Sequence, residues 1–249
     1  MSGKRNRQKV QENKTDKKES MGRVIKDKFK REQAPPILAK TPPQKEFLSA
    51  VHDNNIDVVV FNAPAGCGKS YCAMTTVSDW LKQGRFNKIS ITRPAIGMGN
   101  TLGMLKGGLR DKFEPFLMPL IEVMTQRYGQ SYYENCISNK TLEFQTLEHI
   151  RGRSLGHVVV ADEFQNATPN EMYALLTRME EGGKLIILGD PNQNDMKKEN
   201  GITWLCNFVE KNPELQAKIR VVTATSDNIV RGGLCKMMVK AMEKEIKVA

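Results

Sequence analysis

Two short segments of this sequence carry residues of the types and spacing that phosphate chemistry needs. The first, residues 63–70 (APAGCGKS), fits the P-loop pattern G-x-x-x-x-G-K-[ST] at every position except the first. In such a loop, backbone N–H groups and the N-terminus of the following helix bind phosphate oxygens. Lys69 would reach the β- and γ-phosphates, and the hydroxyl of Ser70 would ligate Mg²⁺. A glycine-rich turn without a ligand has a similar composition, but the order of strand, loop, Lys-Ser and helix favours nucleotide binding.

The loop departs from the pattern where Ala63 replaces the first glycine. Alanine adds one methyl group, so we expect it to be tolerated unless the backbone needs a positive φ at this position. The residues expected to contact the nucleotide are Gln44, Ala63, Pro64, Ala65, Gly66, Cys67, Gly68, Lys69, Ser70 and Tyr71.

Gln44 is included because it lies one short helix upstream of the first core strand. Its amide has a donor and an acceptor that match the N6 and N7 edge of adenine. The sequence Thr41-Pro42-Pro43-Gln44 fits the capped start of a helix equally well. Both interpretations stay open at the level of the sequence.

The second segment is residues 157–163 (HVVVADE), an uninterrupted apolar strand that ends in two acids. At this place in P-loop enzymes, an aspartate such as Asp162 holds Mg²⁺ directly or through water. The next acid, Glu163, is placed to orient or deprotonate the attacking water. Two solvated acids at a strand end are the alternative. A phosphate loop roughly one hundred residues upstream favours the catalytic role.

Other polar residues follow predicted strands or turns. Gln193, in the segment Gly189-Asp190-Pro191-Asn192-Gln193, can contact the γ-phosphate or its water and so report the nucleotide state. Arg93 ends a strand at the edge where α/β sheets bind ligands, or is a surface arginine in a turn. Arg151 and Arg153 form a basic turn that fits a nucleic-acid backbone, a neighbouring subunit or a plain surface loop equally well.

The elements that must position these residues follow from apolar periodicity and turn residues. Continuous apolar runs are typical of the central strands of a parallel sheet, so we predict an α/β domain. Pro115 and Pro119 predict that the helix over residues 109–128 is kinked or broken. The predicted strands cover residues 57–62, 88–92, 142–147, 158–161, 184–188 and 219–224, and the predicted helices cover 44–54, 71–82, 109–128, 169–178, 201–210 and 227–247.

Composition limits the class of protein. At 249 residues, one α/β domain with extra terminal segments is expected. No apolar run approaches about 20 residues and no apolar segment follows the N-terminus, so neither a membrane span nor secretion is expected. The five cysteines are scattered without a C-x-x-C pair, which indicates a reducing cytoplasm and no structural zinc.

The net charge of +10 is concentrated near the N-terminus. Residues 1–40 carry thirteen Lys and Arg against five Asp and Glu, which leaves +2 for residues 41–249. We therefore predict a basic arm over residues 1–34, disordered or partly helical, followed by a domain over residues 35–249. The arm fits nucleic-acid phosphates, and the alternative is a solubilising tail.

Taken together, these motifs resemble those of the PhoH family of P-loop ATPases from about residue 41 to the last helix. The resemblance rests on the segments APAGCGKS, ITRPAIG, HIRGRSL, VVVADEFQNATP, LLTRM, LIILGDPNQND and DNIVRGGL, in that order. The segments around Asp162 and Gln193 also resemble motifs II and III of superfamily 1 helicases. The chain departs from the family at Ala63 and at Phe164 of the DEFQ sequence. We also expect it to lack the N-terminal domain of longer members and any nuclease module.

The resemblance implies a single RecA-like P-loop NTPase domain that hydrolyses ATP with Mg²⁺. It also implies single-stranded nucleic acid as a partner, RNA in preference, and a homo-oligomer, with a hexameric ring favoured. Arg231 matches the family's arginine after the last strand, which makes it a candidate arginine finger in cis or in trans. The compact form looks like phage-encoded members, which would act in the host cytoplasm.

Three functions remain open on the sequence alone. The first is a nucleic-acid-dependent ATPase or helicase, and because one RecA-like domain cannot move by inchworming, translocation would need an oligomer. The second is an ATP-driven regulator or remodeller of a protein partner. The third is a binding module in which the nucleotide is structural, and the acids Asp162 and Glu163 argue against it.

Overall fold

The computed structural model describes residues 34–94, 109–150, 154–155, 157–194 and 199–248. Most of the predicted basic arm lies outside these residues, as do residues 95–108 and both Arg151 and Arg153. Predictions about them therefore stay predictions. The described residues from Ile37 onward belong to one unit, Ile37–Ala249, which is described by itself.

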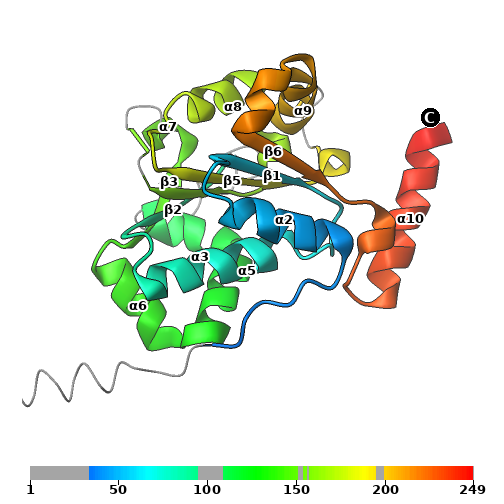
Figure 1. Cartoon of the computed structure of the whole chain (residues 1–249). Coiled ribbons are helices and arrows are strands. Elements are labelled where there is room, and N and C mark those ends of the chain that lie inside the picture. Colours follow the sequence, from blue (N-terminus) through cyan, green and yellow to red (C-terminus); the bar gives the residue numbers. More distant parts are fainter. Residues whose placement is uncertain (1–33, 95–108, 151–153, 156, 195–198, 249) are drawn as a thin grey trace, which may run out of the picture. The chain divides into compact units, whose positions relative to one another are not determined.

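Six parallel strands form one sheet in the described part of the chain, in the order β3-β2-β4-β5-β1-β6 (Figure 1). The strand before the phosphate loop, β1, is separated from the strand before the two acids, β4, by β5 alone. The strands are β1 (Val58–Asn62), β2 (Ile89–Arg93), β3 (Leu142–Thr146), β4 (Val158–Ala161), β5 (Lys184–Gly189) and β6 (Ile219–Thr223). This confirms the predicted α/β fold with its parallel sheet.

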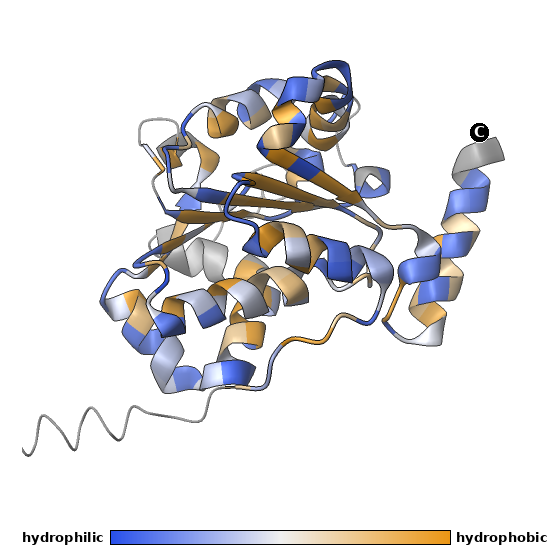
Figure 2. Ribbon diagram, viewed as in Figure 1, coloured by the Kyte–Doolittle hydropathy of each residue, from blue (hydrophilic) through white to orange (hydrophobic). Residues whose placement is uncertain are grey.

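Helices cover both faces of the sheet, which explains why the central strands are apolar without alternation (Figure 2). One face packs against α2 (Pro42–His52), α3 (Lys69–Gln83), α5 (Leu109–Tyr128) and α6 (Gln130–Ser138). The other face packs against α7 (Leu147–Ile150), α8 (Pro169–Leu176) and α9 (Gly201–Lys211). Residues of β1 alternate between the two cores, with Val59 and Phe61 in the first and Val58 and Val60 in the second.

Polar contacts fix the helices that carry the site. Thr168 caps α8 in a reciprocal capping box with Glu171, and Pro169 is the first helical residue, as predicted. Asp79 of α3 accepts hydrogen bonds from Arg127 and from Tyr128 of α5. This network joins the helix that starts at the phosphate loop to its neighbour on the same face of the sheet.

The structure differs from the predicted elements in three places. The helix α5 continues through Pro115 and Pro119, so it is not broken there, and the alternative of a kink stays a prediction. The helix α6 was not predicted, since its buried residues are only Tyr133 and Cys136 and give little periodicity. The terminal helix α10 (Gly233–Val248) starts later than residue 227, after the short 3-10 helix η4 (Ser226–Asn228), so Arg231 precedes the helix. Gly232 and Gly233 disfavour a helix there.

No helix in the described part of the chain combines the length and the apolar character that a membrane span requires.

Candidate active site

The phosphate loop joins the end of β1 to the start of α3, as its sequence predicts. Gly66 and Gly68 have φ of 83° and 81°, a left-handed conformation that favours glycine. Ala63 is absent from the non-glycine residues with positive φ in the described chain, which explains why alanine is tolerated in place of the first glycine. The loop therefore leads into the N-terminus of α3, which presents N–H groups to an anion.

Gln44 holds the phosphate loop through its side-chain amide. Its side chain is 4% exposed, its Nε2 donates to the carbonyl oxygen of Cys67 at 2.9 Å, and its Oε1 accepts from the N–H of Lys40 at 2.7 Å. Thr41 caps the start of α2 by accepting from the N–H of Gln44. The capped helix start is thus present, and contact of Gln44 with adenine stays a prediction.

Lys69 and Asp190 hold the phosphate loop through hydrogen bonds to its backbone. The Nζ of Lys69 donates to the carbonyl oxygens of Ala63 at 2.6 Å and Pro64 at 3.1 Å. The carboxylate of Asp190 accepts from the N–H of Ala65 at 3.0 Å, which ties the end of β5 to the loop. Burial raises the pKa of Asp190, while the nearby charge of Lys69 opposes the rise. Sequence reasoning assigned Asp190 no role, although its place after a buried strand was a signal.

Asp162 is buried at the end of β4 and is 6% exposed. Burial raises its pKa to about 6, and the adjacent Glu163 adds to the rise, while Arg93 and Lys69 oppose it. A buried carboxylate under this penalty is stabilised by a cation, and Mg²⁺ prefers oxygen ligands such as Asp162 and the Ser70 hydroxyl. Among the described residues, no three His, Cys, Asp or Glu side chains gather into a metal site. Phosphate and water would therefore complete the coordination of Mg²⁺.

Glu163 has an unusual backbone. With φ of 54° and ψ of 37°, it is one of two non-glycine residues with positive φ in the described chain. Strain of this kind at a strand end is common where a side chain must be aimed at a site. The Oε2 of Glu163 accepts from Nε2 of Gln165 at 2.6 Å, and its Oε1 lies 3.8 Å from Nη2 of Arg93.

Gln165 connects the two acidic segments. It is 1% exposed, and its Oε1 accepts from the N–H of Asp190 at 3.1 Å. The same side chain therefore holds Glu163 after β4 and Asp190 after β5. Sequence reasoning noted Gln165 without a role, because the pairing of two distant loops is set by the order of strands.

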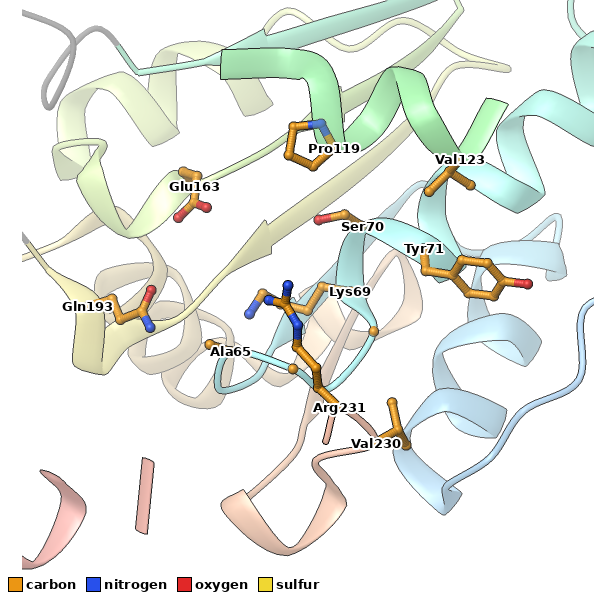
Figure 3. Close-up of a pocket in the computed structure, with 12 residues that line it drawn as sticks. Ala65, Lys69, Ser70, Tyr71, Pro119, Val123, Glu163, Gln193, Val230 and Arg231 are labelled. Carbon is orange, nitrogen blue, oxygen red and sulfur yellow. The ribbon is translucent and has the colours of Figure 1, made fainter. Parts of the chain in front are cut away.

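A pocket of about 470 Å³ brings several of the predicted residues together, as Figure 3 shows, whereas Asp162 and Gln44 are outside its lining. Lys69 and Ser70 lie centrally, with Glu163 and Gln193 on one side and Tyr71 and Val123 on the other. The described residues that line it are Ala65, Gly66, Gly68, Lys69, Ser70, Tyr71, Pro119, Val123, Glu163, Gln193, Val230 and Arg231. One side of the pocket is thus polar, and the other is aromatic and aliphatic.

Arg231 reaches this pocket through backbone contacts with the phosphate loop. The N–H groups of Val230 and Arg231 both donate to the carbonyl oxygen of Gly66, at 3.0 and 3.2 Å. These bonds hold the segment before α10 in a non-helical path, which is the physical reason for its late start. The guanidinium of Arg231 extends toward Lys69 of the same chain (Figure 3).

The strand order, the phosphate loop and the acids after β4 define a P-loop NTPase domain of the RecA-like class. Comparison with known proteins identifies the particular family. A model of the PhoH-like protein family matches residues 36–243, and the chain belongs to that family.

Curated relatives agree with this assignment. The chain is 34% identical over 210 residues to a PhoH-like protein of Bacillus subtilis (strain 168), covering 84% of this chain and 65% of the relative. It is 35% identical over 162 residues to a PhoH-like protein of Mycobacterium leprae (strain TN), covering 64% and 46%. It is 29% identical over 210 residues to protein PhoH of Escherichia coli (strain K12), covering 83% and 58%. The chain therefore spans less than two thirds of the length of these relatives.

Solved structures share the fold at low identity. The large terminase of bacteriophage HK97 has a TM-score of 0.53 at 15% identity, covering 86% of this chain and 48% of the terminase. The large terminase of a thermophilic bacteriophage, in complex with ADP, has a TM-score of 0.50 at 13% identity, covering 80% and 48%. At this identity the likeness concerns the fold.

Proposed function

We propose that this protein is a Mg²⁺-dependent ATPase that couples hydrolysis to the binding or remodelling of single-stranded nucleic acid, RNA in preference. The observation that carries the proposal is the single pocket that Lys69, Ser70, Glu163, Gln193 and Arg231 line together. These side chains come from separate segments of the chain, and each has the chemistry that one part of phosphoryl transfer needs.

In the proposed reaction, a water attacks the γ-phosphorus of ATP, the bond to the β–γ bridging oxygen breaks, and ADP and phosphate leave. Glu163 accepts the proton of the attacking water, and Gln193 contacts that water or the γ-phosphate. Lys69 and Arg231 stabilise the charge on the transferred group. Ser70 and Asp162 would hold Mg²⁺, which neutralises phosphate charge when bound. The aromatic and aliphatic side of the pocket, with Tyr71 and Val123, fits the base.

Two features support nucleic acid as the partner. The region before the domain is basic, with thirteen Lys and Arg in residues 1–40, and cationic segments bind phosphate backbones. The edge of the sheet that carries the two acids also carries Arg93, the last residue of β2. Arg151 and Arg153 precede β4 in the sequence. We propose all three arginines as contacts for nucleic acid. A cytoplasmic location accords with this proposal.

An oligomer is supported by the apolar face of α10, and the family resemblance favours a hexameric ring. Leu234, Met237, Met238 and Met242 are 74%, 70%, 57% and 51% exposed. An exposed apolar group of this kind is typical of protein contact surfaces. The same face supports the second candidate, an ATP-driven regulator or remodeller of a protein partner without nucleic-acid coupling.

Steady-state ATP hydrolysis, with and without single-stranded RNA and DNA, tests the proposal. Glu163→Gln is the inactive control, because an amide cannot accept the proton at the same position. Stimulation by one nucleic acid, lost in this variant, would support the first candidate and identify the substrate. Hydrolysis indifferent to both nucleic acids would contradict it and favour a protein partner.

Removal of residues 1–33 separates the two candidates further. If the arm binds phosphates, its loss should weaken nucleic-acid binding and flatten the dependence of the affinity on salt concentration. Fluorescence anisotropy with a labelled oligonucleotide at several salt concentrations measures both effects. An unchanged salt dependence would argue for the solubilising tail.

A further inference from the structure

Glu163 is held on both carboxylate oxygens. Its Oε2 accepts from the buried amide of Gln165 at 2.6 Å, and its Oε1 faces Nη2 of Arg93 at 3.8 Å. A carboxylate oxygen engaged by a cation is less available to orient water or to take its proton. The contact with Arg93 is therefore expected to reduce the activity of Glu163.

The two partners of Glu163 differ in how easily they can be displaced. Gln165 is 1% exposed and is fixed by the N–H of Asp190. The side chains of Arg93 and Glu163 are 24% and 34% exposed, and their contact is longer than a close ion pair. Water and salt screen such a pair, so its partners exchange readily. Arg93 is therefore the replaceable partner.

The sheet places Arg93 where an outside ligand can reach it. It is the last residue of β2, which pairs in parallel with β4, and the N–H of Asp162 donates to the carbonyl oxygen of Thr92 at 2.9 Å. Glu163 lines the nucleotide pocket, whereas Arg93 is outside the set of described residues that line it. Arg93 thus approaches the carboxylate of Glu163 from outside the lining of this pocket.

We propose that Arg93 restrains Glu163, and that a backbone phosphate of single-stranded nucleic acid takes over Arg93 and releases the carboxylate for hydrolysis. A phosphate competes well for this side chain, because the planar guanidinium binds phosphate oxygens in a bidentate manner. Arg93 is then a positioning residue that couples nucleic-acid binding to the rate of hydrolysis. This proposal rests on the proposed ATPase function.

The test compares kcat and KM of wild type, Arg93→Gln and Lys88→Gln, each with and without single-stranded RNA. Lys88 is a matched control, because it precedes the same strand and pairs with Glu143 at 2.8 Å and similar exposure. Loss of the restraint in Arg93→Gln should raise the basal kcat by up to about fivefold, the size expected for an exposed ion pair. KM for ATP should stay unchanged, and stimulation by RNA should disappear. Lys88→Gln should behave as wild type.

Arg93→Lys is a second test variant in case Arg93→Gln does not fold. Lysine keeps the charge but lacks the bidentate geometry, so this variant should keep a low basal rate and respond less to RNA. Thermal unfolding of each variant shows whether it is folded. A lower basal kcat, a higher KM for ATP or an unaltered response to RNA in folded Arg93→Gln would overturn the proposal.

Two separate measurements test the proposed function and the restraint on Glu163. A wild type that RNA and DNA do not stimulate contradicts nucleic-acid coupling and overturns the release step with it. Comparing the basal kcat of wild type and Arg93→Gln then still tests whether Arg93 restrains Glu163, since neither assay contains nucleic acid. Equal basal rates in wild type and Arg93→Gln overturn the restraint whatever the effect of RNA on the wild type.

Discussion

Replacing Gly68 by alanine perturbs the phosphate loop at one of its two glycines with positive φ. Gly68 has φ of 81°, and a Cβ added there would lie 2.8 Å from Nε2 of Gln44, closer than side-chain atoms pack. The left-handed conformation costs an alanine about 1–2 kcal/mol. Displacing the Gln44 amide from the carbonyl of Cys67 costs about 0.5–1.5 kcal/mol more. We expect these effects to sum to about 1.5–3.5 kcal/mol, or about 10–300-fold weaker nucleotide binding if the substituted loop relaxes when empty and must regain its shape to bind.

Equilibrium titration with a fluorescent ATP analogue measures this loss, and Gly84→Ala is the matched control. Gly84 ends α3 with φ of 72°, and an added Cβ there meets nothing within 4 Å. It carries the same backbone strain away from the pocket, so it should lower stability but leave nucleotide affinity unchanged. Adding Gln44→Ala to Gly68→Ala should recover part of the affinity, because it removes the crowded amide. Nucleotide binding by Gly68→Ala as tight as that of Gly84→Ala would refute the reasoning.

Two further predictions concern the network between α3 and α5. Asp79→Ala would leave the Arg127 side chain, 10% exposed, without the carboxylate that accepts its hydrogen bonds. We expect the free energy of unfolding, measured in urea, to fall by about 3–5 kcal/mol, and a loss near zero would contradict the role of the network. Burial, with Asp79 beside it, raises the pKa of Tyr128 from 10.0 to about 12. The unfolded chain loses this proton first, so the contribution of Tyr128 to stability should be fully present below pH 10.0 and should be lost as the pH rises from there toward about 12. Tyrosinate absorbance and urea unfolding check this, with Tyr128→Phe as the variant in which that part of the pH dependence is absent.

Local sequence was enough to place the phosphate loop. Its pattern depends on spacing along a few consecutive positions, so the loop and its glycines could be located from the sequence alone, while the roles of Lys69 and Ser70 stay predictions. The apolar runs also determined the strands, because a strand buried on both faces leaves little choice of residue. Asp162 and Glu163 followed from their place at the end of such a run.

The start of the last helix could not be predicted in this way. Residues 227–232 were expected to be helical, but the backbone N–H groups of Val230 and Arg231 bond to Gly66 instead. That competing acceptor lies more than 160 residues earlier in the chain. A helix prediction from neighbouring residues has no access to such a contact, and tertiary context overrides local propensity here.

The sequence by itself predicted which residues would carry phosphate chemistry, and it determined that they follow parallel strands. Only the tertiary structure decided which of them meet, because the order of strands is not written in any one segment. That order places Arg93 beside Glu163, lets Gln165 hold both acidic loops, and ties Asp190 to the phosphate loop. The physical reason is that parallel strands align their carboxyl ends at one edge, where side chains distant in sequence come within contact of one another.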